Sequence, residues 1–383
     1  MRALRVAIVG AGVISRVHAG VLSSRGDVVL AAIVDPDLDA AKRLAGELPR
    51  HPDRPSLYRS LTQALTVEPI DLVVVTSHSS SHAELAETAI EAGCHVLLEK
   101  PVDTDLARAR RLCGLAAESD RVVGVVSQRR FAPAVMAITD AVRSGRLGRI
   151  TSATATLAWW RGDDYYASAA WRGTWAGDGG GALMNQGIHA VDILLSIMGT
   201  PVAVTGTART LAHESLEVED VAAAVVTFES GAVATLLATT AAFPENSTRF
   251  QIHGTRGSAF VQDGRLEYFG VDHPPSTVVT PEGARVGDRS THEVPSYALP
   301  GAASDSDALS DHGRQYDDLI DAIHQRHEPR ASLHDAGRAL AVIVAVYLSH
   351  TLERPVRFAE VMAGDYDALD YRSPIRQGTE GTV

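Results

Sequence analysis

The sequence predicts an α/β fold in two parts, a doubly wound parallel sheet followed by an α+β region. In the first 127 of its 383 residues, short Val- and Ile-rich runs alternate with helix-like stretches, which is the pattern of βαβ units. After about residue 128, apolar and polar residues alternate between glycine turns, which is typical of antiparallel strands. The length also exceeds a single ordinary core, so we expect two domains, residues 1–127 and 128–383.

Five apolar runs in the first part are the expected strands of the parallel sheet. They show little alternation, which suits strands that are covered on both faces. Helix-like stretches such as DAAKRLAGEL and SHAELAETAIEAG lie between them. In chain order the expected strands are RVAIVG, VVLAAIVD, DLVVVTS, CHVLLEK and RVVGVVSQ.

The second part mixes helices with strands. FAPAVMAITDAVRSGRLGRI is expected to form a helix that ends at a glycine turn, and ITSATATLAWW a half-buried strand. Several antiparallel strands are expected from residue 201 to about 270, and helices at 314–326 and 335–350. Residues 271–308 are rich in Pro, Ser and Gly, so we expect a loop there, and we expect disorder in the polar tail from about 371.

Composition excludes several classes of protein. The formal net charge is -12, and no Lys/Arg cluster with interleaved aromatics is present, so nucleic-acid binding is not expected. No apolar run approaches the ~20 residues of a membrane span. MRALRVAIVGAG runs straight into a strand, so we expect no signal peptide. Cys94 and Cys113 are expected to be reduced, as in a cytoplasmic protein, and no His/Cys spacing predicts a metal site.

The stretch VAIVGAGVIS predicts a dinucleotide-binding turn. Gly10 permits a tight turn after a strand, and Gly12 lets the backbone approach a pyrophosphate at the N-terminus of the next helix. Asp35 ends the next strand, 23 positions after Gly12, close to the ~20 expected for a ribose-binding carboxylate. A carboxylate there repels a 2′-phosphate, so the sequence favours NAD over NADP. The alternative for Gly10 and Gly12 is a bare glycine turn, and the alternative for Asp35 is a simple turn residue.

The segment LLEKPVD places Lys100 at the carboxyl end of a parallel strand, where ligands bind in such sheets. Its ammonium group suits a substrate hydroxyl and the alkoxide that forms during hydride loss. Pro101 sets the local turn and is compatible with a cis peptide bond. The alternative reading of Lys100 is a solvated charge at a strand end.

The stretch GGGALMNQGIHAVD, residues 179–192, predicts a polar face on a helix. Asn185, His189 and Asp192 are spaced by four and three residues and would share one face. His189 is the natural general base, because its ordinary pKa of ~6.5 suits proton transfer near neutrality. Glycines 179–181 leave room for another group to approach, and the cofactor ring is our expectation. A structural role is the alternative for His189 and the favoured role for Asp192.

The stretch WWRGDDYYASAAWRGTW, residues 159–175, contains all four tryptophans of the chain. Aromatic faces stack on the C–H faces of sugar rings, so this segment is expected to line a carbohydrate site. The alternative is that about half of these aromatics fill the core or a subunit contact. Arg129, Arg130, Arg161 and Arg172 also suit an anionic sugar, although arginines brace domain junctions as well.

Together these motifs resemble the glucose–fructose oxidoreductase and inositol dehydrogenase family over roughly residues 3–360. The resemblance rests on GAGVIS, Asp35, AGCHVLLEKP, QRRFAP, GRLGRI and GGGALMNQGIHAVD. It implies an N-terminal Rossmann domain and a C-terminal α+β domain with an open, mainly antiparallel sheet, whose outer face commonly makes a dimer or tetramer interface. It also implies oxidation or reduction of a secondary carbon of a sugar or cyclitol with a nicotinamide cofactor.

The resemblance makes Lys100, His189 and Asn185 the expected catalytic residues. Asn185 departs from the aspartate of many members, and TSHSSSH departs from their Thr-Pro-Asn. The expected cofactor site comprises Gly10, Gly12, Val13, Ile14, Asp35, Thr76, Ser77, His78, His82, Glu99, Lys100, Pro101 and Gln128. The expected substrate site comprises Lys100, Arg129, Trp160, Arg161, Tyr165, Tyr166, Trp171, Arg172, Asn185 and His189.

Three classes of function remain open from the sequence. The first is a dehydrogenase acting on a ring hydroxyl of a sugar, glycoside or cyclitol. The second is a glycosidase that oxidises the sugar transiently with tightly held NAD, at C3 by our expectation, and later reduces it again; Tyr165 or Tyr166 would be its additional acid. The third is a non-catalytic dinucleotide sensor, against which the presence of Lys100 and His189 counts.

Overall fold

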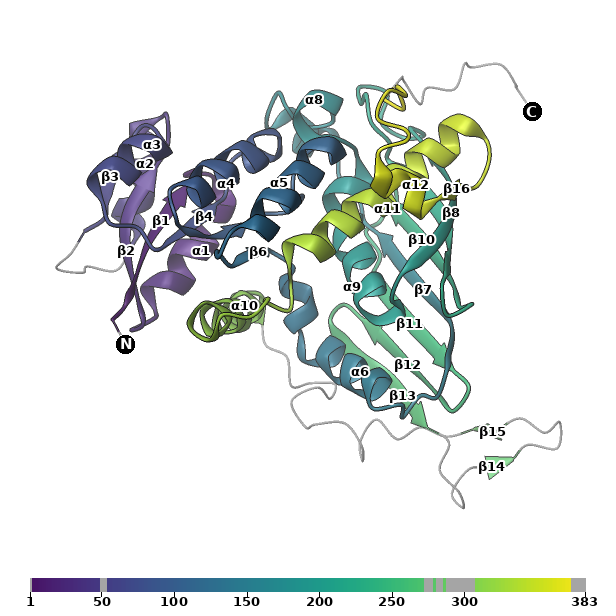
Figure 1. Ribbon diagram of the computed structural model, residues 1–383. Coiled ribbons are helices and arrows are strands. Elements are labelled where there is room, and N and C mark those ends of the chain that lie inside the picture. Colours follow the sequence, from purple (N-terminus) through teal and green to yellow (C-terminus); the bar gives the residue numbers. More distant parts are fainter. Residues whose placement is uncertain (1, 49–53, 272–277, 280–284, 287–306, 373–383) are drawn as a thin grey trace. The chain divides into compact units, whose positions relative to one another are not determined.

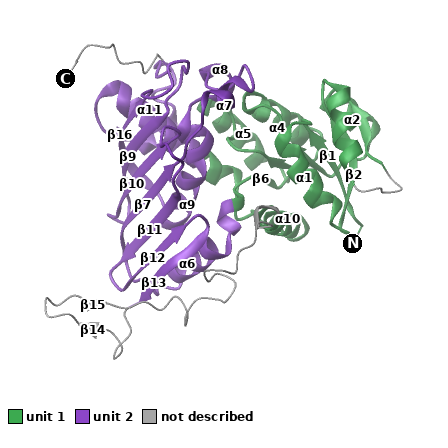
Figure 2. Ribbon diagram, turned by 180° about the vertical axis from the view of Figure 1, so that it is seen from behind, with its two compact units in different colours: residues 1–128, 308–337 green, residues 129–307, 338–383 purple. Residues whose placement is uncertain are grey.

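The structure, a computed structural model, describes residues 2–48, 54–271, 278–279, 285–286 and 307–372 (Figure 1). Nearly all of the loop expected at 271–308, and the tail beyond 372, lie outside the described residues. The chain divides into two compact units, residues 1–128 with 308–337, and residues 129–307 with 338–383 (Figure 2). These units differ from the two contiguous stretches expected, because a later segment returns to the first unit.

The first unit contains a six-stranded sheet in the order β3-β2-β1-β4-β5-β6, in which all neighbours are parallel. The strands are β1 Leu4–Val9, β2 Val28–Val34, β3 Ser56–Tyr58, β4 Leu72–Val75, β5 His95–Leu98 and β6 Val123–Val125. The helices of this unit are α1 Val13–Ser23, α2 Leu38–Glu47, α3 Leu61–Val67, η1 Ser79–Ser81, α4 His82–Glu91, α5 Leu106–Glu118 and α10 Asp307–Gln325. The strand order places β1 and β4 side by side at the centre, where the connections reverse direction.

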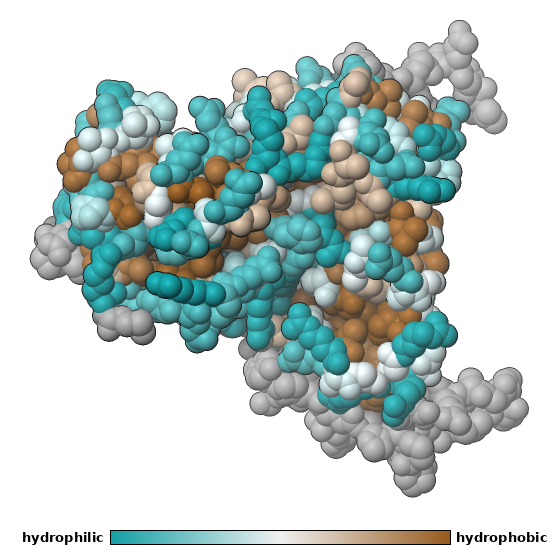
Figure 3. Space-filling model, in the orientation of Figure 1, coloured by the Kyte–Doolittle hydropathy of each residue, from teal (hydrophilic) through white to brown (hydrophobic). Residues whose placement is uncertain are grey.

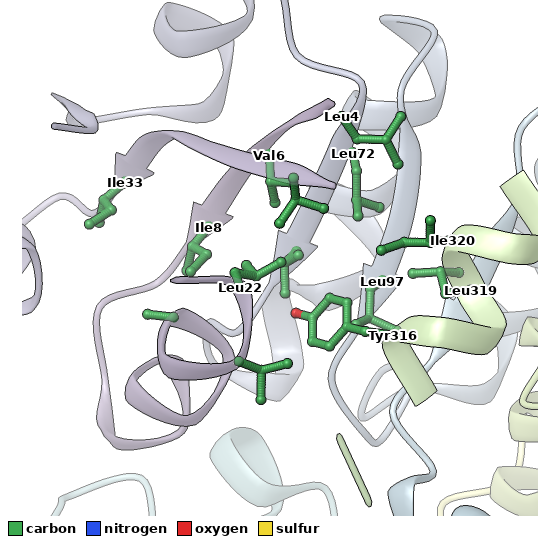
Figure 4. Packing of buried hydrophobic residues seen from close by; sticks show 14 of the residues in the cluster. Leu4, Val6, Ile8, Leu22, Ile33, Leu72, Leu97, Tyr316, Leu319 and Ile320 are labelled. Carbon is green, nitrogen blue, oxygen red and sulfur yellow. The ribbon is translucent and has the colours of Figure 1, made fainter. Parts of the chain in front are cut away.

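The core of this unit explains why its strands read as unbroken apolar runs. Val6 and Ile8 on one face of β1 and Ala7 on the other are all fully buried, so both faces of the sheet are covered. Helix α10 completes this core: Figure 4 shows Tyr316, Leu319 and Ile320 directed toward the strands, and all belong to the same buried cluster. Gln315 of α10 also joins the end of β6, accepting from Ser127 N at 3.0 Å and donating to Val125 O at 2.7 Å.

The second unit contains an eight-stranded sheet in the order β13-β12-β11-β7-β10-β9-β8-β16. Only β10 and β7 are parallel; the other neighbouring pairs are antiparallel. The strands are β7 Ile150–Ala158, β8 Pro201–Arg209, β9 Val221–Phe228, β10 Val233–Thr239, β11 Thr248–Gly254, β12 Gly257–Gln262, β13 Arg265–Val271 and β16 Val356–Arg357. A separate pair is formed by β14 Val278–Val279 and β15 Arg285–Val286. The fold class expected from the sequence is therefore confirmed.

One face of the second sheet is covered by helices. Helix α9 packs against β7, and α6 packs against α9. Along β10, buried Ala234 and Leu236 alternate with exposed Val233 and Leu237, which is the alternation of a sheet with one open face. The helical elements are η2 Gln128–Phe131, α6 Pro133–Arg143, α7 Asp163–Ala167, α8 Trp175–Asp178, η3 Leu183–Gly187, α9 Ile188–Met198, α11 Leu333–Leu352 and α12 Phe358–Ala363. Helix α11 begins in the first unit and continues into the second.

The surface, the helices and the two cysteines bear on the expectations from composition. Figure 3 shows hydrophilic residues over much of the face it presents, with apolar areas between them. Within the described residues, no helix combines the length and the apolar character that crossing a membrane requires. Cys94 and Cys113 are free thiols, and burial raises the pKa of each to about 11.

Candidate active site

The glycine turn between β1 and α1 is built as the sequence predicted. Gly10 has φ +100°, and a Cβ there would lie 2.7 Å from the carbonyl oxygen of Thr76. Thr76 Oγ1 in turn donates to the Gly10 carbonyl at 2.9 Å, which joins the turn to the end of β4. Only glycine fits this position, because a side chain would strain the backbone and collide with the neighbouring strand end.

The start of α1 is open to a ligand. Gly12 is the N-cap and supplies no side chain to cap the helix, and a Cβ there would meet nothing within 4 Å. Val13 in the first turn is 79% exposed. Ser15, at the third glycine position of the fingerprint, is fully buried and donates to Gly12 O at 2.5 Å. Unused N–H groups at an open helix N-terminus fit the pyrophosphate of a dinucleotide.

Asp35 holds the same turn from the end of β2. Its carboxylate accepts from Ala11 N and from Asp37 N, each at 2.8 Å, and the residue is half-buried. A carboxylate offers about four acceptor positions, so it can bind ribose hydroxyls while keeping both bonds. Arg59, which the sequence analysis did not consider, lies close by and donates to Pro36 O at 2.6 Å.

The ends of β4 and β5 are tied together by His82. Its ring nitrogens lie 2.7 Å from the Pro101 carbonyl oxygen and 3.1 Å from that of Ser77. The residue is buried, and this burial lowers its pKa below the ordinary histidine value. The Lys100–Pro101 bond is cis, the form that the sequence allowed. His82 thus fixes the backbone on either side of the expected nicotinamide site, while His78 is exposed.

Glu99 belongs to a buried cluster beneath Lys100. Its carboxylate lies 3.0 Å from His18 Nε2 and accepts from Lys100 N at 3.0 Å; Tyr316 Oη lies 2.8 Å from His18 Nδ1. His312 packs edge-on against the His18 ring, with centroids 5.4 Å apart. Potential ligand atoms of His18, Glu99 and His312 lie within 4.8 Å of one another, the geometry of a possible metal group. The hydrogen bonds already engage Glu99 and His18, so we interpret the cluster as a support for the Lys100 backbone.

Two expected site residues of this unit remain partly open to a ligand. Lys100 is half-buried, whereas Glu99 and Pro101 on either side are buried. Gln128 is half-buried as well, and its Oε1 atom is buried without a hydrogen-bond partner among the described residues. A buried acceptor without a partner carries a free-energy cost, which a ligand donor would remove. Their contacts with the cofactor stay predictions.

The glycine stretch of the second unit serves packing within that unit. Gly179 has φ +71° and ends α8. A Cβ at Gly180 would lie 2.3 Å from Tyr347 Oη, and one at Gly181 would lie 1.7 Å from the carbonyl oxygen of Glu219. The groups that approach Gly180 and Gly181 closely are therefore Tyr347 and the Glu219 backbone, and the expectation that the stretch also makes room for the cofactor ring stays a prediction.

Asn185 and His189 follow this stretch on two different kinds of helix. Asn185 lies in the π-helical turn η3, where its Nδ2 donates to Gly180 O at 3.3 Å, and His189 lies in the first turn of α9. Single π turns inside helices recur at functional sites. Both side chains are half-buried, between buried neighbours such as Ile188 and Ala190. The α-helical spacing used for the sequence does not extend across the π turn, so the shared face stays a prediction.

Asp192, one turn further along α9, forms an ion pair. Its two carboxylate oxygens accept from Arg130 Nε and a terminal guanidinium nitrogen, each at 2.6 Å. Both side chains are more than nine-tenths buried. This ion pair is a structural role of the kind that the sequence favoured for Asp192. Breaking a buried bidentate pair is costly, so this pair fixes α9 relative to the segment before α6.

The aromatic segment forms a layer of rings and guanidinium groups. The Arg172 guanidinium lies 4.3 Å from the Tyr165 ring centroid and 4.5 Å from that of Trp171, and it donates to Tyr165 Oη at 2.6 Å. Gln186, next to Asn185, also donates to Tyr165 Oη, at 3.3 Å. Arg172 Nε is buried without a partner among the described residues. Tyr165 and Arg172 are therefore placed beside the turn that carries Asn185.

The remaining rings of the segment divide between surface and core. Arg161 and Arg129 lie over the Trp159 ring, at 4.8 Å and 5.7 Å from its centroid. Tyr166 Oη lies 2.8 Å from Thr240 Oγ1, and burial raises its pKa to about 12. Trp175 is buried and meets Tyr347 edge-on, so it belongs to the core, as about half of these aromatics were expected to do.

Two acidic residues before β9 were missed by the sequence analysis. Asp220 is fully buried, accepts from three backbone N–H groups and lies 3.0 Å from His213 Nδ1. The His213 ring packs against Trp160 and Tyr166, at 5.3 Å and 5.2 Å between centroids. Glu219 is also fully buried and bonds the glycine stretch. The signal was a Glu-Asp pair set between Val218 and Val221, where apolar residues would be expected.

Comparison with known proteins settles the family. Residues 4–127 match the oxidoreductase family with an NAD-binding Rossmann fold, and residues 135–260 match the GFO/IDH/MocA C-terminal domain. The chain belongs to the GFO/IDH/MocA family. This confirms the resemblance, and with it an oxidoreductase whose Rossmann domain binds NAD, a cofactor with which related structures have been solved.

Relatives in this family act on sugars and cyclitols. The chain is 27% identical to the inositol 2-dehydrogenase of Rhizobium meliloti over 68% of this chain and 76% of that protein. It is 33% identical to the D-glucoside 3-dehydrogenase of Escherichia coli over 52% and 55%. Several other curated relatives are matched over about half of their length.

Solved members are matched over nearly their whole length. The WlbA dehydrogenase from Chromobacterium violaceum, solved with NADH and UDP-GlcNAcA, has a TM-score of 0.79 and 28% identity, covering 93% of this chain and 96% of that one. The Bordetella pertussis WlbA dehydrogenase, solved with the same compounds, has a TM-score of 0.80 and 26% identity, covering 93% and 98%.

Proposed function

We propose that this GFO/IDH/MocA protein is an NAD-dependent dehydrogenase that oxidises a secondary ring hydroxyl of a sugar, glycoside or cyclitol. The observation that carries the proposal is the exposure of two side chains. Lys100 and His189 stay half-buried, whereas the residues on either side of each are buried. Polar side chains that are accessible on rigid, buried backbone are what a catalytic site needs.

The chemistry divides between the two side chains. His189 would take the proton of the substrate hydroxyl, as a general base whose ordinary pKa lies near neutrality. Lys100 would bind the same oxygen and stabilise the negative charge that develops on it. Asn185 would donate a further hydrogen bond to this oxygen. As a neutral amide, it cannot raise the basicity of His189 as an aspartate would. NAD, when bound, supplies the acceptor for the hydride of the ring carbon.

Substrate contacts are proposed for the aromatic segment. Trp160 and Trp171 offer faces for a sugar ring, and Tyr165 offers a hydroxyl that already accepts from Arg172 and Gln186. The Nε atom of Arg172 lacks a partner among the described residues and would suit a carboxylate or phosphate oxygen. UDP-GlcNAcA bound to the WlbA relatives is an anionic sugar nucleotide, which supports testing acidic sugars beside neutral ones.

The test is to incubate the purified protein with NAD and with inositols, alkyl and aryl glucosides, and sugar nucleotides that carry a carboxylate. Net NADH formation is expected. Release of the aglycone from an aryl glucoside without net NADH would instead support the NAD-linked glycosidase. Binding of NAD with no turnover of any of these compounds would favour the dinucleotide sensor.

We also propose that the open face of the second sheet joins copies of the chain. Val225, Val233 and Leu237 are each at least 36% exposed and lie on the neighbouring strands β9 and β10. Adjacent apolar side chains on an open sheet face favour association. In gel filtration with light scattering, Leu237→Lys should shift a dimer or tetramer toward smaller species, and a monomeric wild-type protein would refute the proposal.

A further inference from the structure

Glu219 lies under the start of the helix that carries His189, although the chemistry proposed above does not use it. Its Oε2 accepts from Gly181 N at 2.8 Å, and its Oε1 accepts from Leu183 N at 2.9 Å. The Glu219 backbone carbonyl accepts from Ala182 N at 2.9 Å. One residue therefore takes the N–H groups of three successive residues, which would otherwise be unsatisfied at the start of a helix.

Tyr347 of α11 completes this arrangement, in which Glu219 and Tyr347 hold Gly181, Ala182 and Leu183 and which we call the cradle. Its hydroxyl donates to Glu219 Oε1 at 2.9 Å, and both residues are buried to within 1% of their surface. A Cβ at Gly180 would strike that hydroxyl, and one at Gly181 would strike the Glu219 backbone. The glycines are therefore needed where they lie against Glu219 and Tyr347. The chain leaves this cradle directly into the π turn, where Asn185 N bonds Gly181 O at 2.9 Å.

The cradle depends on the charge of Glu219. An ionised carboxylate accepts on both oxygens, which matches the two N–H groups and one O–H group directed at it. A protonated carboxyl group is a weaker acceptor, and the Tyr347 hydroxyl must turn to accept its proton, so the bonds from Gly181 N and Leu183 N weaken. Protonation therefore loosens the turn that begins the helix, and the hydrogen bonds at Gly181 and Leu183 are the ones exposed to this change.

The surroundings of Glu219 make such a change accessible near neutral pH. Burial raises its pKa to about 7, although the hydrogen bonds from Leu183, Gly181 and Tyr347 act in the opposite direction. Among the described residues, the titratable groups whose pKa the charge of Glu219 raises are Tyr347 on α11 and Tyr166 on α7, and Asp220 is the next residue along the chain. Asp220 is paired with His213. His189 is the next ionisable group along η3 and α9.

We propose that Glu219 is a positioning residue for Asn185 and His189, and that only its ionised form holds them in the active geometry. The inference rests on the proposed function, because His189 is the base assigned there. It adds a second titration to the acidic limb of the activity, one that belongs to Glu219 rather than to the base itself.

The test compares Glu219→Gln and Tyr347→Phe with the wild type by pH–rate profiles and by amide hydrogen exchange of a peptide covering 179–187. Glu219→Gln should lower kcat by about 10- to 100-fold with the KM for NAD unchanged, because a small displacement of a catalytic group costs this much. In Glu219→Gln, the backbone amides of residues 179–187 should also exchange quickly at every pH. Tyr347→Phe removes one donor to the carboxylate, so it should move the acidic limb to higher pH.

A matched pair in the same unit controls for the chemistry of the substitutions. Tyr366, which follows α12, donates from Oη to Oε2 of Glu360 in the first turn of α12 at 2.5 Å, so Glu360→Gln and Tyr366→Phe make the same changes away from the helix that carries His189. Both should leave the profile and the exchange of 179–187 unchanged. If Glu219→Gln does not fold, Tyr347→Phe still shows whether the acidic limb of the pH–rate profile moves.

The inference and the proposed function fail differently. The positioning role is overturned if Glu219→Gln keeps the wild-type kcat and the wild-type acidic limb of the pH–rate profile. It is also overturned if the acidic limb of Tyr347→Phe does not move. If exchange at 179–187 responds to Glu219 while His189→Ala retains activity, the base assignment is wrong and the cradle stands only as a structural element.

Discussion

Each unit buries one glutamate beside a residue of the candidate active site, and the two carboxyl groups behave oppositely. Glu99 and Glu219 both bond backbone N–H groups, and each is linked to a tyrosine of a C-terminal helix, Tyr316 through His18 and Tyr347 directly. Burial raises the pKa of Glu99 as well, but the hydrogen bond and charge of His18 and the charge of Lys100 bring it below the ordinary value. Within the part of the chain that the structure describes, the donors to the Glu219 carboxyl group are neutral, and burial raises its pKa to about 7.

The difference teaches that burial alone does not decide the charge of a carboxyl group. Backbone N–H groups and a phenol soften the cost of desolvation, whereas a basic partner reverses it. The first unit thus keeps Glu99 ionised under Lys100 over a wide pH range. The second unit holds the His189 helix on a carboxyl group whose charge changes near neutral pH.

The largest effect is expected from filling the space beside Glu219. Gly181→Ala would put a methyl group 1.7 Å from the Glu219 carbonyl oxygen, so the free energy of unfolding should fall by more than about 4 kcal/mol. Gly12→Ala is the matched control in the first unit, because a Cβ there meets nothing within 4 Å. Denaturant unfolding of both variants measures the contrast. Equal stabilities would mean that the cradle is not rigid.

The pH dependence of stability should separate the two glutamates. The folded protein holds the Glu219 proton up to about pH 7, whereas the unfolded chain releases it near 4.5. Because a buried charge is costly, ionisation of Glu219 lowers the free energy of unfolding as pH rises between these values, by roughly 3 kcal/mol, even though the ionised carboxylate accepts stronger hydrogen bonds from Gly181 and Leu183. Glu99 acts in the opposite sense: its contribution is present above pH 4.5 and is lost as pH falls below it.

Urea unfolding of the wild type and Glu219→Gln at several pH values tests this linkage. The variant should be less sensitive to pH between 4.5 and 7, because the titrating group is gone. Identical pH dependence in both proteins would show that Glu219 titrates in the folded state as it does in the unfolded chain.

A smaller effect is expected from making Glu99 resemble Glu219. His18→Gln leaves an amide donor at Glu99 but removes the basic partner, so the pKa of Glu99 should rise. We expect a loss of roughly 1–3 kcal/mol at neutral pH and a new acidic limb in turnover. His334→Gln, on an exposed position of α11, is the control. An unchanged pH–rate profile for His18→Gln would remove the contrast between the two glutamates.

What the sequence could predict was local chemistry. The turn at Gly10, the helix start at Gly12 and the strand-end Asp35 depend on residues close together in the chain, and their fold context is confirmed. The alternating runs between glycine turns likewise predicted antiparallel strands, and the family resemblance implied that their sheet is open. The positions of Lys100 and His189 in the candidate site came from motif and resemblance together, and their catalytic roles stay predictions.

What the sequence could not predict was which distant segments meet. Nothing local places Tyr316 of α10 against the first sheet, or Tyr347 of α11 against Glu219. The glycine stretch was interpreted as space for a cofactor, because its partners lie 38 and more positions further along the chain. The π turn at Leu183–Gly187 was missed because a period of 3.6 was assumed through Asn185.

The central claim is that His189 is the base of an NAD-dependent oxidation. The most direct measurement is the turnover of His189→Ala on a substrate found with the wild type, together with its affinity for NAD and with His334→Ala as a control. We expect turnover to fall by about 10²–10⁴-fold with NAD affinity nearly unchanged. Turnover close to that of the wild type would contradict the account.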